Sequence, residues 1–340
     1  MFCAVKSIFH NDKLQKLLVC LFIVLFFEQI GVINLKRVIV TGAAGFVGQY
    51  LCRDLLSRDI EVIGVDISRE KLDAVSQDNR FIPIVADFSK YDSLHECIRY
   101  NDIDVFYHLA WNGANSVAFR NAELQLSNSI YSVKALDTAI ALKCKKFVFA
   151  GSYYEYESQS IFSMDEFQPR YSNIYGASKF VTDLVLCEKS KLEGILYSSA
   201  LLPAVYGEGL SSPTMVKVLL SNFAEGKPSK LVAGDNPYDL IYVGDVARAF
   251  FYIGERGKDM ARYYVGHRMI DTFKENITRI RDLLSPNSEL LFGEYHETQN
   301  LDYSLIDTEK LFNDTGFECK ADFNTTIQRT YEWIKNRGKL

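Results

Sequence analysis

Residues 41–48 are Thr-Gly-Ala-Ala-Gly-Phe-Val-Gly, and they come directly after the apolar run Arg-Val-Ile-Val at residues 37–40. The run predicts a β-strand, and the glycines after it predict a tight turn that leads into a helix. Gly42 permits the sharp turn, Gly45 lets the backbone approach a pyrophosphate, and Gly48 lets the helix pack closely on the strand. The stretch therefore predicts a dinucleotide-binding turn.

The first turn of the predicted helix contains Phe46 and Val47. Backbone N–H groups at a helix amino terminus have no partner within the helix, so they are available to bind phosphate oxygens. We expect these two residues to bind the cofactor together with the three glycines. Glycines at this spacing are weak evidence alone, but their position directly after a strand strengthens the prediction.

Short apolar runs alternate with longer amphipathic stretches over the first half of the chain. Strands buried on both faces of a parallel sheet are continuously apolar, as these runs are. The alternation predicts a Rossmann-type doubly wound parallel sheet, an α/β fold with helices on both faces. The predicted strands are residues 37–40, 61–65, 81–86, 104–109 and 146–150, and the predicted helices are 47–57, 94–100, 124–142 and 175–189.

After residue 195 the pattern becomes less regular. We expect an N-terminal extension at residues 1–34, an NAD(P)-binding Rossmann domain at 35–195 and a smaller α/β substrate lobe at 196–340. Part of this lobe, at about residues 238–255, is expected to return to the Rossmann domain. Loops are predicted at 207–213 and 226–237, and further helices at 245–254, 273–284 and 325–335.

Composition excludes several classes of function. The chain has 340 residues and a net charge of −5, and no basic patch interleaved with aromatics is present, so nucleic-acid binding is not expected. The seven cysteines are scattered, with no Cys-x-x-Cys pair or Cys/His cluster. We therefore expect neither a metal site nor a disulfide framework.

The N-terminal extension contains an unbroken apolar run at residues 17–27, preceded by several lysines. Eleven residues are few for a bilayer span, and lengthening the run to residue 33 admits Glu28 and Gln29. Three interpretations remain: a short anchor, an interfacial segment, or an extension absent from the working protein. We expect a cytoplasmic protein, since translocation would separate it from its cofactor pool, with at most weak membrane association through residues 14–33.

Two acidic residues end predicted strands near the glycine turn. Asp66 lies eighteen residues after Gly48, where a carboxylate can accept hydrogen bonds from both ribose hydroxyls. It would repel a 2′-phosphate, which favours NAD over NADP, although Ser68 and Arg69 would tolerate the phosphate. The alternative makes Asp66 a turn residue at the end of a strand.

Asp87 ends the third predicted strand. Its carboxylate is placed to bind the adenine amino group, with Phe88 packing on the adenine ring. The alternative for Asp87 is a helix cap or a turn carboxylate.

Tyr175 and Lys179 lie in the stretch Tyr-Gly-Ala-Ser-Lys, four residues apart. On a helix this spacing puts both side chains on one face. A nearby ammonium favours the phenolate, which makes the tyrosine a plausible acid and base. Together with the glycine turn, the pair predicts hydride chemistry at an alcohol or ketone carbon.

These motifs, in this order, resemble the extended short-chain dehydrogenase/reductase family, in particular its NAD-dependent epimerase/dehydratase branch, which modifies nucleotide sugars. The resemblance runs from about residue 35 to near the carboxyl terminus. It also includes His108-Leu109-Ala110, Gly151-Ser152, Leu202-Pro203-Ala204-Val205-Tyr206-Gly207 and Leu240-Ile241-Tyr242-Val243-Gly244-Asp245-Val246-Ala247.

The resemblance implies a role for each matching residue. Tyr175 would exchange a proton with the sugar hydroxyl, Lys179 would lower the tyrosine's pKa and contact the nicotinamide ribose, and Ser152 would bind the reacting oxygen. Asn128 would hold backbone or a water near the lysine. Leu109, Ala110 and Pro203 would line the cofactor site, and a homodimer formed helix to helix is the implied assembly.

The chain departs from the family pattern after Ser152. Dehydratases of the family carry an Asp-Glu pair there, whereas this chain has Tyr153 and Tyr154. Glu155 would point to the other face of an extended segment. We therefore expect dehydration to be disfavoured.

Two further departures concern the nucleotide end of the substrate site, where the family's arginines are replaced by Leu202 and Tyr238. Trp111 either lines the pocket or packs in the core.

The preferred interpretation is an NAD(P)-dependent nucleotide-sugar epimerase or 4-keto-sugar reductase. The alternatives are a non-sugar alcohol dehydrogenase or reductase of the same family, and a catalytically silent NAD-binding scaffold or sensor.

Overall fold

The computed structural model describes residues 31–114, 117–161, 170, 172–295, 301 and 303–337. Most of the apolar N-terminal segment lies outside these residues, so the predicted weak membrane association stays a prediction. Within the described ranges, no helix is both long and apolar enough to cross a membrane.

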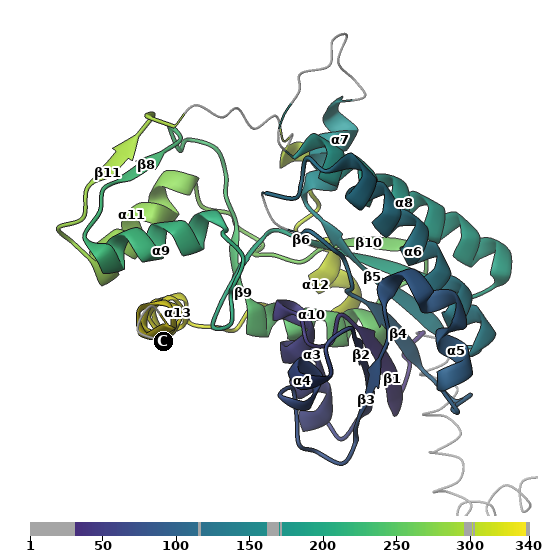
Figure 1. The fold of residues 1–340 in the computed structure, drawn as a ribbon. Coiled ribbons are helices and arrows are strands. Elements are labelled where there is room, and N and C mark those ends of the chain that lie inside the picture. The colour runs from purple at the N-terminus through teal and green to yellow at the C-terminus, as the bar shows by residue number, and fades with distance from the viewer. Residues whose placement is uncertain are drawn as a thin grey trace, which may run out of the picture.

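The centre of the molecule is a sheet of seven parallel strands, in the order β10-β6-β5-β4-β1-β2-β3 (Figure 1). The five predicted strands are confirmed, each within two residues of its expected ends. The chain crosses between non-adjacent strands and builds the sheet outward from β1 in both directions, which is the doubly wound topology. The strands are β1 Arg37–Thr41, β2 Glu61–Asp66, β3 Phe81–Val85, β4 Val105–His108, β5 Lys146–Ser152, β6 Leu196–Leu202 and β10 Ala261–Tyr264.

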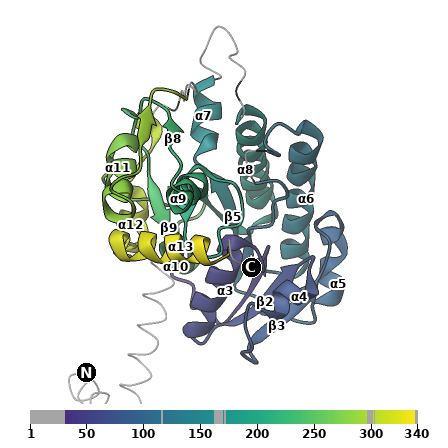
Figure 2. The same ribbon diagram turned by 60° about the vertical axis from the view of Figure 1, so that its left-hand side comes forward.

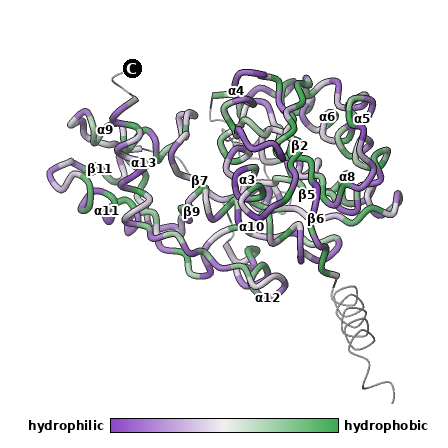
Figure 3. The backbone as a smooth tube through the Cα atoms, turned by 90° about the horizontal axis from the view of Figure 1, so that it is seen from below, coloured by the Kyte–Doolittle hydropathy of each residue, from purple (hydrophilic) through white to green (hydrophobic). Residues whose placement is uncertain are grey.

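Helices cover both faces of this sheet (Figures 1 and 2). Alternating residues of β1 show the division: Val38 and Val40 belong to the core beneath α3 and α10, and Ile39 belongs to the core beneath α6 and α8. The central strands β1, β2, β4 and β5 are therefore buried on both sides, whereas the edge strand β3 is partly exposed. Green, hydrophobic segments run near the labels β2 and β5 in Figure 3. The helices of this domain are α3 Phe46–Ser57, α4 Arg69–Asp73, η1 Phe88–Ser93, α5 Leu94–Cys97, α6 Ala122–Ala141, α7 Tyr154–Ile161, α8 Asn173–Glu193, α10 Val243–Arg256 and α12 Lys310–Thr315.

A smaller lobe lies beside the sheet and has its own apolar core (Figure 1). The predicted loop at 226–237 contains a short strand, β8, so that part of the prediction was wrong. The chain also returns to the main sheet over a longer stretch than 238–255, because β10 pairs with β6. The elements outside the main domain are β7 Ala204–Tyr206, β8 Ser229–Leu231, β9 Leu240–Tyr242, β11 Leu290–Phe292, α9 Met215–Glu225, α11 Phe273–Leu284, η2 Tyr303–Leu305 and α13 Phe323–Arg337.

A buried lysine ties the returning helix α10 to the sheet. Lys146 begins β5, and its Nζ donates to the carbonyl oxygens of Ile253 at 2.7 Å and Gly257 at 2.6 Å. These carbonyls lie at the carboxyl end of α10, where a cation is favoured. The Ile253 carbonyl also accepts from the Gly257 N–H at 2.9 Å. Burial lowers the pKa of Lys146 to about 7.

Replacement of this lysine should destabilise the fold. We expect Lys146→Met to lower the free energy of unfolding by about 2 kcal/mol, because two carbonyl oxygens each lose the hydrogen bond from the lysine. Lys145→Met is the matched control, since Lys145 is exposed and pairs with Asp104 at 2.6 Å; it should cost at most about 1 kcal/mol. Equal midpoints in urea denaturation for the two variants would contradict this account.

Candidate active site

The glycine turn between β1 and α3 is tightly constrained. Gly42 has φ +68°, and Gly45 donates its N–H to the Gly42 carbonyl at 2.9 Å. A Cβ on Gly48 would lie only 2.0 Å from that same carbonyl oxygen. Since Gly45 is the N-cap residue of α3 and has no side chain, it leaves the first N–H groups of the helix, including those of Phe46 and Val47, uncapped.

The turn presses against the end of the neighbouring strand β4. A Cβ on Gly42 would lie 2.9 Å from the backbone nitrogen of Ala110 and 3.0 Å from the carbonyl carbon of Leu109. Beneath them, the Thr41 hydroxyl and His108 Nδ1 are 2.8 Å apart. Burial lowers the pKa of His108 to about 3, so this ring is a neutral structural group. The structure thus brings the turn together with Leu109 and Ala110, as the sequence predicts.

Asp66 lies beside the glycine turn at the end of β2. Its carboxylate accepts from the backbone N–H of Ala44 at 3.1 Å and from that of Ile67 at 2.8 Å. These bonds fix the orientation of the carboxylate and leave lone pairs on both oxygens. The geometry is compatible with the predicted ribose contact.

Asp87 and Phe88 lie after β3. The Asp87 carboxylate accepts from the N–H of Ser89 at 2.8 Å and from its hydroxyl at 2.6 Å, and these bonds lower the pKa of the aspartate. Asp87 therefore caps η1, the alternative left open above. Phe88 is buried against the rings of Tyr91, His108 and Tyr131, and its contact with adenine stays a prediction.

The reactive residues meet where β5 ends. Ser152 is the last residue of β5, and Tyr175 lies in the first turn of α8. A hydrogen bond with Ser152 acts to lower the pKa of Tyr175. Lys179 lies one turn further on α8, and both it and Tyr175 contact Trp111: the lysine Nζ is 3.7 Å from the ring centroid, and the tyrosine ring meets it edge to face at 6.2 Å. The two side chains therefore share one face of α8.

Aromatic rings enclose Tyr175. Phe119 stacks on it with ring centroids 4.2 Å apart, and Tyr154 meets it edge to face at 5.9 Å. This burial raises the pKa of Tyr175 above its usual value, and its effect is larger than that of Ser152. The direction is opposite to the one expected from the sequence, because the enclosing rings desolvate the phenolate.

Lys179 is buried as well. Its Nζ donates to the Ala150 carbonyl at 2.7 Å, and burial lowers its pKa to about 7. The lysine is thus oriented by backbone of β5 and by the face of Trp111, which accepts a cation favourably. Trp111 belongs to the site because its ring contacts both Lys179 and Tyr175. Its Nε1 donates to Gln125 at 2.7 Å, which holds the ring in place.

Asn128 forms a reciprocal pair of hydrogen bonds with the backbone of Asn112. Its Nδ2 donates to the Asn112 carbonyl at 2.8 Å, and its Oδ1 accepts from the Asn112 N–H at 3.0 Å. Asn112 directly follows Trp111, so Asn128 fixes the segment that covers Lys179. The resemblance implies that Asn128 holds either backbone or a water near the lysine, and the structure contains the backbone contact.

The segment after Ser152 is not extended but helical, which corrects the expectation for Glu155. Helix α7 begins at Tyr154, and Glu155 turns back beneath the strand end. Its Oε1 accepts from the N–H of Ser152 at 2.9 Å, and the side chain is fully buried. Alternation of faces along a strand therefore does not apply to this carboxylate.

Leu202 and Tyr238 stand where the family has arginines, and they lie at the border between the two lobes. Leu202 ends β6, where its carbonyl accepts from Tyr153 N–H at 3.0 Å, and the buried Pro203 follows it. The Tyr238 ring packs edge to face on Phe273 at 5.1 Å. Neither replacement carries a positive charge.

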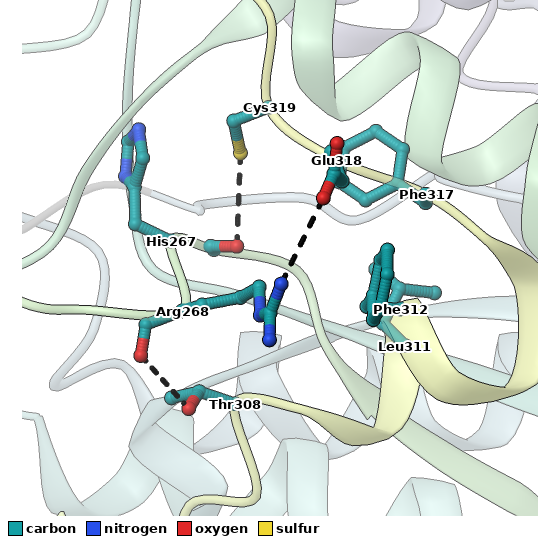
Figure 4. A pocket seen from close by; sticks show the side chains of 9 residues that line it. His267, Arg268, Thr308, Leu311, Phe312, Phe317, Glu318 and Cys319 are labelled. Atoms are coloured by element: carbon teal, nitrogen blue, oxygen red, sulfur yellow. Dashed lines mark hydrogen bonds and ion pairs between the residues drawn. The ribbon is translucent and has the colours of Figure 1, made fainter.

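A separate hollow of about 290 Å³ lies between the end of β10 and α12 (Figure 4). His267 at its edge is held by Asp239, with Nδ1 2.7 Å from Oδ1, and Arg268 pairs with Glu309. No predicted site residue lines this hollow. Among the described residues, no group of three or more His, Cys, Asp or Glu could hold a metal ion.

Comparison with known proteins identifies the class. The NAD dependent epimerase/dehydratase family matches residues 38–266. A probable dTDP-glucose 4,6-dehydratase of Sinorhizobium fredii is 25% identical over 89% of this chain and 93% of its own length. A dTDP-4-dehydro-6-deoxyglucose reductase of Escherichia coli is 23% identical over 88% of this chain and 97% of its own length.

Among solved structures, the UDP-glucose 4-epimerase of Thermus thermophilus in complex with NAD is similar in fold. Its TM-score is 0.70 at 21% identity, over 90% of this chain and all of that one. Since the family match covers most of the chain, this protein belongs to the NAD-dependent epimerase/dehydratase family of the extended short-chain dehydrogenases. Its curated relatives include epimerases, dehydratases and reductases of nucleotide sugars.

Sequence reasoning missed two sets of residues at the site. Phe119 lies in an irregular loop, and nothing local indicates that its ring would stack on Tyr175. Asp183 and Arg262 lie behind the site and are described below. Asp183 carried one usable signal, since it falls one turn after Lys179 on the same helix face.

The close packing of Gly48 gives a direct test of the cofactor turn. We expect Gly48→Ala to lower the free energy of unfolding by about 1–3 kcal/mol and to weaken NAD binding about tenfold or more, because the methyl group would displace the turn. Denaturation and isothermal titration calorimetry measure the two effects.

The control is Gly194→Ala, at a helix end where φ is +73° and a Cβ meets open space. It should cost about 1 kcal/mol of backbone strain and leave NAD affinity unchanged. Unaltered NAD affinity in Gly48→Ala would contradict the assignment of the turn.

Proposed function

We propose that this protein is an NAD-dependent nucleotide-sugar epimerase or 4-keto-sugar reductase in which Tyr175 exchanges the proton of the reacting hydroxyl. One observation carries the proposal. Tyr175 is hydrogen-bonded to Ser152 and lies one helical turn from Lys179, at the strand edge that also bears the glycine turn. Proton donor, oxygen-binding hydroxyl and cation thus converge beside a dinucleotide cradle.

The residues of the turn fit NAD. A side chain at Gly42 or Gly48 would collide with backbone, and the amino terminus of α3 offers uncapped N–H groups to a pyrophosphate. Asp66 has acceptor capacity for the ribose hydroxyls and favours NAD over NADP. When bound there, NAD supplies a hydride acceptor or, reduced, a hydride donor.

The chain's own residues handle the proton. Ser152 binds the reacting oxygen and holds it against the Tyr175 phenol oxygen. As the phenolate, Tyr175 takes the proton of the substrate hydroxyl during oxidation, and as the neutral phenol it gives a proton back during reduction. Lys179 provides positive charge beside the developing phenolate. Substrate and cofactor must enter between the enclosing rings, so Phe119 has to move away from Tyr175 during each cycle.

Dehydration is disfavoured by the side chains after Ser152. Elimination of water needs an acid and a base beside the sugar. Tyr153 and Tyr154 occupy the positions of that pair, and Glu155 is buried beneath the Ser152 N–H. We infer that the chain catalyses epimerisation or reduction, although several of its relatives are named as 4,6-dehydratases.

We infer further that the protein forms a homodimer through α6 and α8. These helices pack on each other and expose apolar side chains on their outer surface. A stripe of this kind on adjacent helices is costly in water unless a second copy covers it. The exposed residues are Leu126, Ile130, Val181, Leu184 and Val185.

Removal of the phenol hydroxyl tests the chemistry. We expect Tyr175→Phe to lower kcat about 10³-fold while NAD affinity stays within about twofold, because proton transfer is lost and cofactor contacts remain. The assay is turnover of a nucleotide-sugar panel with NAD⁺, NADH or NADPH, with product stereochemistry determined by NMR. An epimerase should purify with NAD and need none added, whereas a reductase should need added NAD(P)H.

Tyr252→Phe is the matched control, since Tyr252 lies on α10, where it packs on Phe317. It should turn over at the wild-type rate. Near wild-type turnover in Tyr175→Phe would exclude the proposed role, and bound NAD without turnover on any substrate would favour the scaffold alternative.

Charged substitutions on α6 and α8 test the proposed dimer. We expect Ile130→Glu with Leu184→Glu to convert the dimer to a folded monomer, as measured by analytical ultracentrifugation, because two carboxylates per subunit would be buried without partners. Leu283→Glu, an exposed leucine on α11, is the control and should stay dimeric. A wild-type monomer at micromolar concentration would refute the assembly.

A further inference from the structure

A buried cluster of charged side chains lies directly behind the reactive residues. Arg262, on β10, donates from Nη2 to Glu155 Oε2 at 3.0 Å and from Nε to Asp183 Oδ2 at 2.8 Å. The exposed fractions of the two carboxylate side chains are 0% and 3%. One guanidinium therefore bridges two carboxylates that are removed from water.

The cluster connects the elements that carry the reactive groups. Glu155 accepts from the Ser152 N–H at 2.9 Å, which attaches the cluster to the end of β5. Asp183 lies on α8, one turn beyond Lys179 and two turns beyond Tyr175. Arg262 thus links the Ser152 turn, α8 and the edge strand β10 through side-chain bonds alone.

Asp183 is also held from the adjacent strand β6. Its Oδ1 accepts from the Tyr197 hydroxyl at 2.5 Å, and its Oδ2 accepts from the Ser199 hydroxyl at 3.0 Å. With Arg262 these bonds give the carboxylate three donors. Such complete pairing is what permits a charged group to remain buried.

The charges of the cluster balance that of Lys179. When all four groups are ionised, the positive charges of Arg262 and Lys179 equal the negative charges of Glu155 and Asp183. Both carboxylates act to raise the pKa of Lys179, against the larger effect of burial, which lowers it to about 7. Burial and the neighbouring Asp183 raise the pKa of Glu155 in turn.

Other titratable groups around Lys179 do not supply this balance. His108 on β4 is buried and neutral, with its pKa lowered to about 3. Burial raises the pKa values of Tyr175 on α8 and Tyr197 on β6, so both are neutral near pH 7. Glu155 and Asp183 are thus the groups that act to raise the pKa of Lys179.

We propose that Glu155, Asp183 and Arg262 are positioning residues that hold Ser152, at the end of β5, in place relative to α8. Their carboxylates also compensate the charge of Lys179. The cluster acts through other residues, since Glu155 holds the Ser152 N–H and Arg262 binds Glu155 and Asp183. The proposal rests on the proposed function for its catalytic meaning, but the charge coupling is a property of the protein by itself.

The coupling is measured by ¹³C NMR of protein labelled at the lysine ε-carbons, without cofactor, with Lys179→Arg used to assign the Lys179 signal. Glu155→Gln keeps an acceptor for the Ser152 N–H but removes a charge, so the Lys179 midpoint should fall by about one pH unit. Asp183→Asn should lower it as well.

Glu157→Gln is the matched control on the same helix. Glu157 is buried and pairs with Arg170 at 2.9 Å, yet it is not among the groups that act on Lys179. The titration midpoint of Lys179 in Glu157→Gln should equal that in the wild type. No shift in either carboxylate variant, or an equal shift in Glu157→Gln, would overturn the proposal, since a general structural perturbation would not be confined to the two carboxylates of the cluster.

Activity provides the second readout. Where the wild type turns over a substrate, Arg262→Met should lower kcat about tenfold or more with NAD affinity unchanged within about twofold, and Arg262→Lys should recover part of the loss. A wild type without turnover whose Lys179 titration still follows the predicted signs would refute the proposed function and leave the charge coupling standing. Unchanged kcat in Arg262→Met would refute the positioning role.

Discussion

The site depends on the contact between the first turn of the Rossmann domain and the end of the neighbouring strand β4. Gly42 approaches the backbone of Ala110 so closely that no side chain would fit between them. The chain then continues through Trp111, whose ring covers Lys179. Asn128 holds the next residue by its backbone. Cofactor cradle and reactive pair are therefore consecutive parts of one packed surface.

Desolvation is the second physical factor that shapes the pair on α8. Burial acts on Tyr175 and Lys179 in opposite directions: it raises the pKa of the phenol and lowers that of the amine. Both shifts favour the uncharged forms. The carboxylates behind the lysine oppose this tendency, while the ring of Phe119 reinforces it at the tyrosine. Entry of ligands between these rings would change the balance, which links motion of Phe119 to the acid strength of Tyr175.

Much of this arrangement could be predicted from the sequence, because its causes are local. Continuous apolar runs gave the five strands, and the order of motifs along them gave the family. Parallel strands all end at one edge of the sheet, which is why the glycine turn and Ser152, each at the end of a predicted strand, lie at the same edge.

Other features depend on contacts between distant segments and could not be predicted. Alternation along a strand was assumed for Glu155, but α7 begins immediately after Ser152 and turns the carboxylate inward. The stacking of Phe119 on Tyr175 arises from a loop without periodicity. Arg262 reaches the site from an edge strand more than a hundred residues after Glu155. The pKa direction of Tyr175 was misjudged for the same reason, since burial is a property of the whole fold.

The central claim is hydride transfer between NAD and a sugar carbon at this site. It is tested most directly by removing bound cofactor from the enzyme and incubating it with NADH deuterated at C4 and a nucleotide 4-keto sugar, followed by ²H NMR and mass spectrometry of the product. The account predicts one deuterium on a single face of the sugar carbon. The deuterium should come from only one of the two faces of the nicotinamide ring. Product that forms without deuterium from either face of the labelled cofactor would contradict it.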